Sequence, residues 1–102
     1  MHANEFEQSV EQIENKLDQT VEWGSDDELF ISSYLHGHVS LAVSHAELSQ
    51  QKTLKQLDAL VSTSLQDAFA NNELELVDQQ KVTRLWSQLI DQASNDTINN
   101  AS

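Results

Sequence analysis

Cysteine and proline are absent from this chain of 102 residues, and glycine occurs only twice. A chain without cysteine forms no disulfide bond, binds no metal through thiolates and has no cysteine nucleophile. Two glycines cannot build a glycine-rich loop that holds a phosphate group, because such a loop needs several glycines close together. These absences exclude thiol chemistry and glycine-rich phosphate sites.

Basic residues are also scarce: five Lys and Arg stand against 17 Asp and Glu, which gives a net charge of −12. Proteins contact nucleic-acid phosphates through Lys and Arg, so the sequence predicts no direct binding of nucleic acid. No run of about 18 apolar residues is present, and we expect no membrane-spanning segment. Residues 1–10 lack a cationic segment followed by an apolar run, so we expect no secretion signal and a cytoplasmic location.

Hydrophobic residues make up 38% of the chain, which is enough for one compact domain. Their spacing is helical throughout, and no segment alternates between apolar and polar residues for long enough to indicate a strand. We expect helices over about residues 4–23, 26–48, 51–70 and 76–91, joined by short turns. The pattern predicts an all-α fold, a small antiparallel four-helix bundle over residues 1–92, followed by a disordered polar tail over 93–102.

The first predicted helix has a narrow apolar seam, typical of a helix at the edge of a bundle. The seam consists of Phe6, Val10, Ile13, Leu17 and Val21. Trp23, next to the following turn, is expected to be partly exposed, whereas Trp86 is expected in the core. Gly24 and the pair Asn71-Asn72 are expected to end their helices by adopting the left-handed conformation.

The second predicted helix begins with the strongest local signal, Ser25-Asp26-Asp27-Glu28. This is a capping box, in which the Ser hydroxyl and the Glu carboxylate each accept a hydrogen bond from the backbone of the other residue. The apolar residues of this helix span roughly 220° of its circumference; they are Phe30, Ile31, Tyr34, Leu35, Val39, Leu41, Ala42, Val43 and Ala46. A helix so widely apolar must be covered on more than one side, so we expect it to be the central helix.

Two groups of residues carry a resemblance to a known family. The first is Ser25-Asp26-Asp27-Glu28-Leu29-Phe30 with Tyr34-Leu35, Gly37-His38 and Leu41-Ala42; the second is Asp78-Gln79 with Val82 and Leu85-Trp86. Together they resemble the YfcL family of small uncharacterised bacterial proteins, mostly from gammaproteobacteria. The resemblance implies an all-helical fold and a bacterial cytoplasmic protein, and it brings no catalytic residues with it.

The acidic residues of the first helix recur at spacings of four, three, four and four: Glu7, Glu11, Glu14, Asp18 and Glu22. They share one flank within about 80° beside the apolar seam. Like charges at this spacing cost an isolated helix a few tenths of a kcal/mol per pair, so this acidic ridge does not serve helix stability. It is interpreted either as a docking strip for a basic partner, in its sharpest form a mimic of nucleic acid, or as a solvated face.

Two histidines of the second helix, His38 and His45, are seven residues apart and therefore about 20° apart around the helix axis. Both fall inside the apolar arc near Tyr34, whereas His36 lies on the polar strip. They are predicted to be core histidines with hydrogen-bond partners. The alternative is a ligand or metal site, although histidines that bind one metal from a helix are usually four residues apart.

A stripe of small residues, Ser33, Gly37, Ser40 and Ser44, runs along the same helix. It would allow close approach of another helix of this chain or of a second subunit, or it is the solvent-facing side.

No catalytic set emerges, because there is no nucleophile elbow and no cysteine–histidine pair. We expect no enzyme and no cofactor, but a non-enzymatic acidic module, monomer or homodimer, that binds a basic protein surface. The alternative is a small-ligand- or metal-binding regulatory protein centred on Tyr34, His38 and His45.

Overall fold

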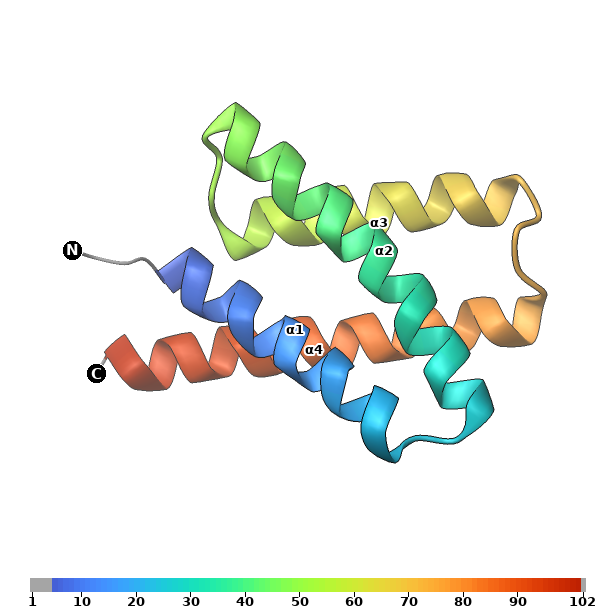
Figure 1. The fold of residues 1–102 in the computed structure, drawn as a ribbon. Coiled ribbons are helices and arrows are strands. Elements are labelled where there is room, and N and C mark those ends of the chain that lie inside the picture. The colour runs from blue at the N-terminus through green and yellow to red at the C-terminus, as the bar shows by residue number, and fades with distance from the viewer. Residues whose placement is uncertain (1–4, 102) are drawn as a thin grey trace.

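The computed structural model describes the backbone of residues 5–101, and the side chains of this range except those of residues 5, 21, 23 and 95–101. It contains four helices: α1 (Glu5–Trp23), α2 (Asp26–Ser49), α3 (Leu54–Ala70) and α4 (Leu76–Ala101) (Figure 1). The predicted all-α four-helix fold is confirmed. The predictions for the side chains of Val21 and Trp23 lie outside the described residues. No helix in the described part of the chain is long and apolar enough to cross a membrane.

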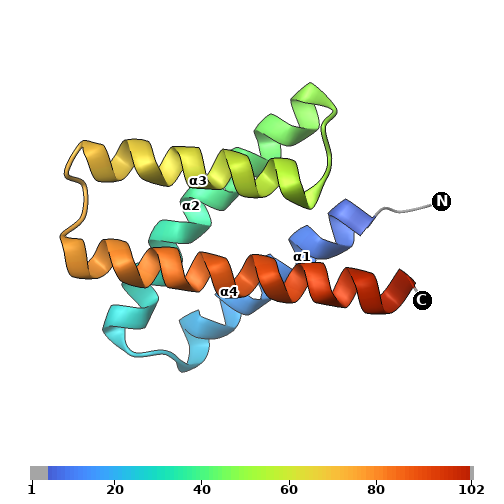
Figure 2. The ribbon, with the colours of Figure 1, turned by 180° about the vertical axis from the view of Figure 1, so that it is seen from behind.

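The four helices form two layers. The hairpin α1–α2 lies over the hairpin α3–α4, as the front and back views show (Figures 1 and 2). The molecule measures 42 × 30 × 18 Å, and its thinnest dimension is close to two helix diameters of about 10 Å. Helices α2 and α4 each contact all three other helices, and α2 does so most extensively, which confirms its central position.

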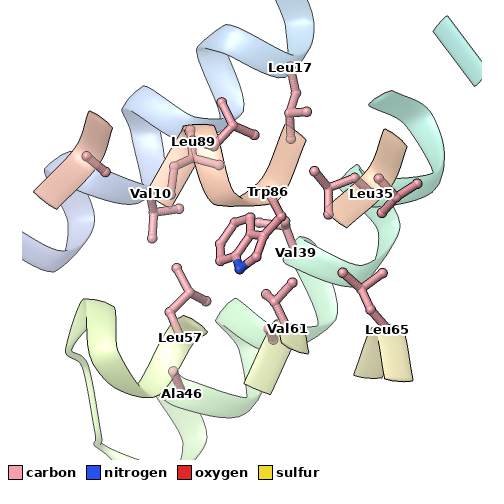
Figure 3. Packing of buried hydrophobic residues seen from close by; sticks show 14 of the residues in the cluster. Val10, Leu17, Leu35, Val39, Ala46, Leu57, Val61, Leu65, Trp86 and Leu89 are labelled. Atoms are coloured by element: carbon pink, nitrogen blue, oxygen red, sulfur yellow. The ribbon is translucent and has the colours of Figure 1, made fainter. Parts of the chain in front are cut away.

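The core lies between the two layers and receives side chains from all four helices. Trp86 of α4 occupies the middle of this cluster, as predicted (Figure 3). Its indole nitrogen donates a hydrogen bond to Oδ1 of Asp58 at 2.8 Å, so the polar atom of this buried side chain is satisfied. The other labelled members in Figure 3 include Val10, Leu17, Leu35, Val39, Leu57, Val61 and Leu89, all buried.

Helix α2 is buried on one face only, and the prediction that its whole apolar arc is covered is wrong. The buried residues are Ile31, Ser32, Leu35, Val39, Ala42 and Ala46. On the opposite side, Phe30 is 48% exposed and Leu41 67% exposed. The reason is the layered packing: α2 lies in the front layer, and none of the other three described helices lies over its outer face (Figure 1).

The helix ends follow the predicted capping signals with one correction. Ser25 and Glu28 form the expected capping box at the start of α2. Asn72 is left-handed with a φ of 61°, but Gly24 does not have a positive φ, so the prediction for Gly24 is wrong. Gly24 is required for space instead: a Cβ atom there would lie 2.6 Å from the carbonyl oxygen of Thr20.

Helix α4 is longer than expected. We expected the helix to end near Asp91 and residues 93–102 to form a disordered tail, but the helix continues to Ala101. Ala93 follows Leu89 by one helical turn and is 2% exposed, so it extends the buried face of α4 beyond the predicted boundary. The sequence after Asp91 also contains no glycine or proline that would break a helix.

Candidate partner-binding groove

A hollow of about 190 Å³ lies between α1 and α2. We call it the acidic groove; its lining consists of Phe6, Glu7, Val10, Glu11 and Glu14 from α1, and Val43 and Glu47 from α2. Four of these seven residues are carboxylates, and none is basic. Three are apolar, so the groove combines apolar surface with negative charge.

The helical repeat of α1 explains how the groove is built. Phe6 and Val10 belong to the apolar seam and are buried, which confirms the prediction for these residues. Glu7 and Glu11 follow them by one position each and are exposed, so the carboxylates stand beside the seam. The acidic ridge therefore borders an apolar strip.

The structure divides the predicted ridge into two parts. Glu7, Glu11 and Glu14 line the acidic groove, whereas Asp18 and Glu22 are exposed but do not line it. The division arises because α1 and α2 meet at the turn near Gly24 and separate toward the other end of α1 (Figure 1). The hollow lies at this wider end of the hairpin.

Two groove residues, Val43 and Glu47, were missed by sequence reasoning. Both belong to α2, 29 to 40 positions away along the chain from Glu7, Glu11 and Glu14. Their spacing of four residues places them on one face of α2. Only the hairpin geometry brings this face against α1, and no local pattern signals it.

The histidines and Tyr34 of α2 do not form one site. The rings of Tyr34 and His38 lie 4.9 Å apart, and Nδ1 of His38 is hydrogen-bonded to Oγ of Ser64. His45 is exposed, and it lies about 10 Å farther along the helix than His38. The prediction that His45 is a core histidine is therefore wrong, whereas His36 is exposed, as predicted.

Tyr34 also contacts the turn between α3 and α4. Its hydroxyl donates a hydrogen bond to Oε1 of Glu73 at 2.9 Å. Desolvation by burial, and then the hydrogen bond and negative charge of Glu73, raise the pKa of Tyr34 to about 12. The contact ties α2 to this turn through a neutral phenol.

The small-residue stripe faces solvent rather than another helix of this chain. Gly37 is exposed, and a Cβ atom there would have no neighbour within 4 Å. Ser33 and Ser44 are exposed as well. Of the readings left open by the sequence, close packing against a helix of the same chain is wrong.

Two other hollows differ from the acidic groove: the first contains basic residues, and in the second a carboxylate already accepts a hydrogen bond. One, of about 270 Å³, includes Lys81 and Arg84, and Lys81 forms an ion pair with Asp27 at 2.6 Å. The hydrogen bond to Asp27 raises the pKa of Lys81. The other, of about 370 Å³, contains Asp58, whose carboxylate already accepts from Trp86. Among the described residues, no group of three or more histidines or carboxylates is arranged to hold a metal ion.

The fold and the groove together define a small, acidic, all-helical protein, and comparisons with known proteins assign its family. The sequence pattern of the family described as "YfcL protein" matches residues 4–91. The chain is similar to the uncharacterized protein YfcL of Escherichia coli (strain K12), with 41% identity over 78 residues, which cover 76% of this chain and 85% of that protein. The chain belongs to the YfcL family, as its sequence motifs indicated. No solved structure matches it significantly.

Proposed function

We propose that this YfcL-family chain is a non-enzymatic, cytoplasmic interaction protein whose acidic groove binds a basic segment of another protein. The observation that carries the proposal is the composition of the groove. Carboxylates of Glu7, Glu11, Glu14 and Glu47 surround apolar side chains, and no Lys or Arg in the lining neutralises them. A hollow lined by charge of one sign attracts a partner of the opposite sign.

The size of the groove favours side chains of a protein over a whole small molecule. Its volume of about 190 Å³ is below the roughly 300–1,000 Å³ that small-molecule sites usually have. The fitting partner is an amphipathic segment that inserts one apolar side chain between Val10 and Val43. Lys or Arg residues on the same segment then reach the carboxylates at the rim.

The surrounding charge supports the same partner. Residues 1–47 contain ten acidic residues and a single basic one, Lys16. Exposed charges of this kind act within a Debye length, about 8 Å at physiological ionic strength. Binding of a basic partner is therefore expected to weaken as salt increases, whereas contact through the apolar strip alone would not weaken.

The chain offers a matched pair of variants for the test. Glu11→Lys with Glu14→Lys reverses two carboxylates in the groove, and Asp18→Lys with Glu22→Lys reverses two exposed carboxylates of the same helix outside it. Each double variant changes the net charge by the same amount. Non-specific attraction to a basic surface would therefore decrease equally in both.

We expect the wild-type chain and the outer variant to capture the same basic protein from an E. coli lysate, and the groove variant to lose it. Isothermal titration with that purified protein should show at least a tenfold weaker affinity for the groove variant, which corresponds to about 1.4 kcal/mol. Equal weakening in both double variants would show attraction by net charge alone. Unchanged binding in both would rule out the acidic groove as the site.

A further inference from the structure

The outer face of α2 differs in composition from the rest of this acidic surface. Residues 29–46 contain no Asp, Glu, Lys or Arg, although the chain carries a net charge of −12. Phe30, Leu41 and Leu48 are all exposed on this face, Leu48 by 85%. Their spacing places them within about 20° of one line along the helix, over about 27 Å. We call this line the α2 ridge.

Small residues adjoin the α2 ridge and leave a notch in it. Gly37 lies one turn before Leu41, and a Cβ atom at Gly37 would have open space around it. Ser33 and Ser44 flank the ridge on the same side. The face therefore has large apolar side chains on both sides of a position that carries no side chain and is open to solvent.

We propose that the α2 ridge binds a second copy of this chain, with the two α2 helices antiparallel and a two-fold axis at the level of residue 39. In this register, Phe30 of one copy meets Leu48 of the other, and Leu41 meets the notch at Gly37. Positions 30 and 48 lie equally far from position 39, and so do positions 37 and 41. A single two-fold rotation at this level therefore forms each of the two contacts twice, once from each copy. A two-fold interface must be self-complementary in this way.

The charges at the two ends of α2 agree with an antiparallel second copy. The helix begins with three acidic residues, Asp26, Asp27 and Glu28, of which Asp27 is paired with Lys81. Its last turn contains Glu47, and two lysines, Lys52 and Lys55, follow its end. Both lysines are exposed, and neither forms an ion pair with another described residue. The antiparallel arrangement brings the acidic start of each helix beside the basic end of the other.

The size of the face sets the expected affinity. Helix α2 has 24 residues and is about 36 Å long, so one exposed side supplies less than the roughly 800 Å² per partner of a standard interface. We therefore expect a dimer in the micromolar range of dissociation constants. The acidic groove opens beside the ridge rather than on it, so this proposal stands independently of the proposed function.

The first test measures mass by sedimentation or light scattering as the protein concentration increases. We expect the mass to rise toward twice 11.5 kDa for the wild-type chain, and Leu41→Glu to remain monomeric. The matched control is Leu76→Glu, because Leu76 on α4 is 67% exposed, as is Leu41. The proposal is overturned if the wild-type mass stays at 11.5 kDa up to millimolar concentration, or if both variants weaken association equally.

The second test checks the register by disulfide cross-linking. Because the chain has no native cysteine, only the introduced cysteines can form a disulfide bond. In the antiparallel pair, Ser33 of one copy lies within one residue of the level of Ser44 of the other. Two copies of Ser33 are about 18 Å apart along the axis, and two copies of Ser44 about 15 Å. Mild oxidation should link Ser33→Cys to Ser44→Cys in a mixture at least tenfold faster than either variant to itself. Equal rates, or no linked dimer in the mixture, overturn the register. Glu11→Lys with Glu14→Lys should leave the dimer intact even if partner binding is lost.

Discussion

Truncating Leu35 and Leu41 to alanine, one at a time, compares how much the buried and the exposed face of α2 contribute to the free energy of unfolding. The two leucines lie on the same helix, six residues apart, but Leu35 is 0% exposed and Leu41 is 67% exposed. Leu35→Ala removes three buried carbons at about 0.8 kcal/mol each. The cavity left between α2 and the other layer raises the expected loss to about 3–5 kcal/mol. Leu41→Ala should change the free energy of unfolding by no more than about 0.5 kcal/mol.

Urea denaturation followed by circular dichroism, at micromolar protein concentration, measures both values. A chain of this length has a total stability of about 5–15 kcal/mol, so the loss from Leu35→Ala is a large fraction of it. Its Tm should fall by more than about 10 °C, since each kcal/mol corresponds to roughly 4–8 °C in a domain of this size. Comparable losses from the two substitutions would refute the layered packing described above, because they would mean that Leu41 is buried.

Two further predictions concern Tyr34 and the glycines. As the only tyrosine, Tyr34 should ionise at a pKa of about 12 when its absorbance is followed against pH, and Glu73→Gln should lower this pKa toward 10. Because the folded-state pKa lies above the unfolded value of 10.0, the stability contributed by Tyr34 is fully present below pH 10 and is lost as the pH rises to about 12; ionisation near 10 in the folded wild type would contradict this. Gly37→Ala should stabilise the chain by about 0.5–1 kcal/mol in thermal denaturation, because Gly37 lies inside α2 with open space around it. Gly24→Ala should destabilise it, since the new methyl group would meet the backbone of Thr20; equal effects of the two would contradict this reasoning.

The local features of the fold were predictable because their causes are local. The capping box at Ser25 depends on side chains three residues apart, and the seam of α1 depends on spacings of three and four. Ile13 and Leu17 are accordingly buried where the spacing indicated. The end of α4 was predicted too early because Ala93 is a small residue whose burial depends on packing rather than on its own hydrophobicity.

The candidate site was predictable only in part. The ridge on α1 supplied Glu7, Glu11 and Glu14, but the pattern alone gave no reason to separate them from Asp18 and Glu22. The structure separates the two groups because α1 and α2 lie farther apart toward the start of α1, where the groove is, than toward the turn that joins them (Figure 1). The exposure of His45 was missed for a related reason: the wide apolar arc of α2 did not indicate which part of it the other helices cover.

The amino-acid sequence by itself determined the four helices, most of their ends, the negative charge and the membership of the YfcL family, since each follows from residues near one another along the chain. The tertiary structure alone decided which side of α2 is buried and that Val43 and Glu47 complete the acidic groove. The physical reason is that hydrophobic burial has no direction of its own. A helix with apolar residues over most of its circumference gains from covering any of them, and the two-layer packing determines which face remains exposed to water.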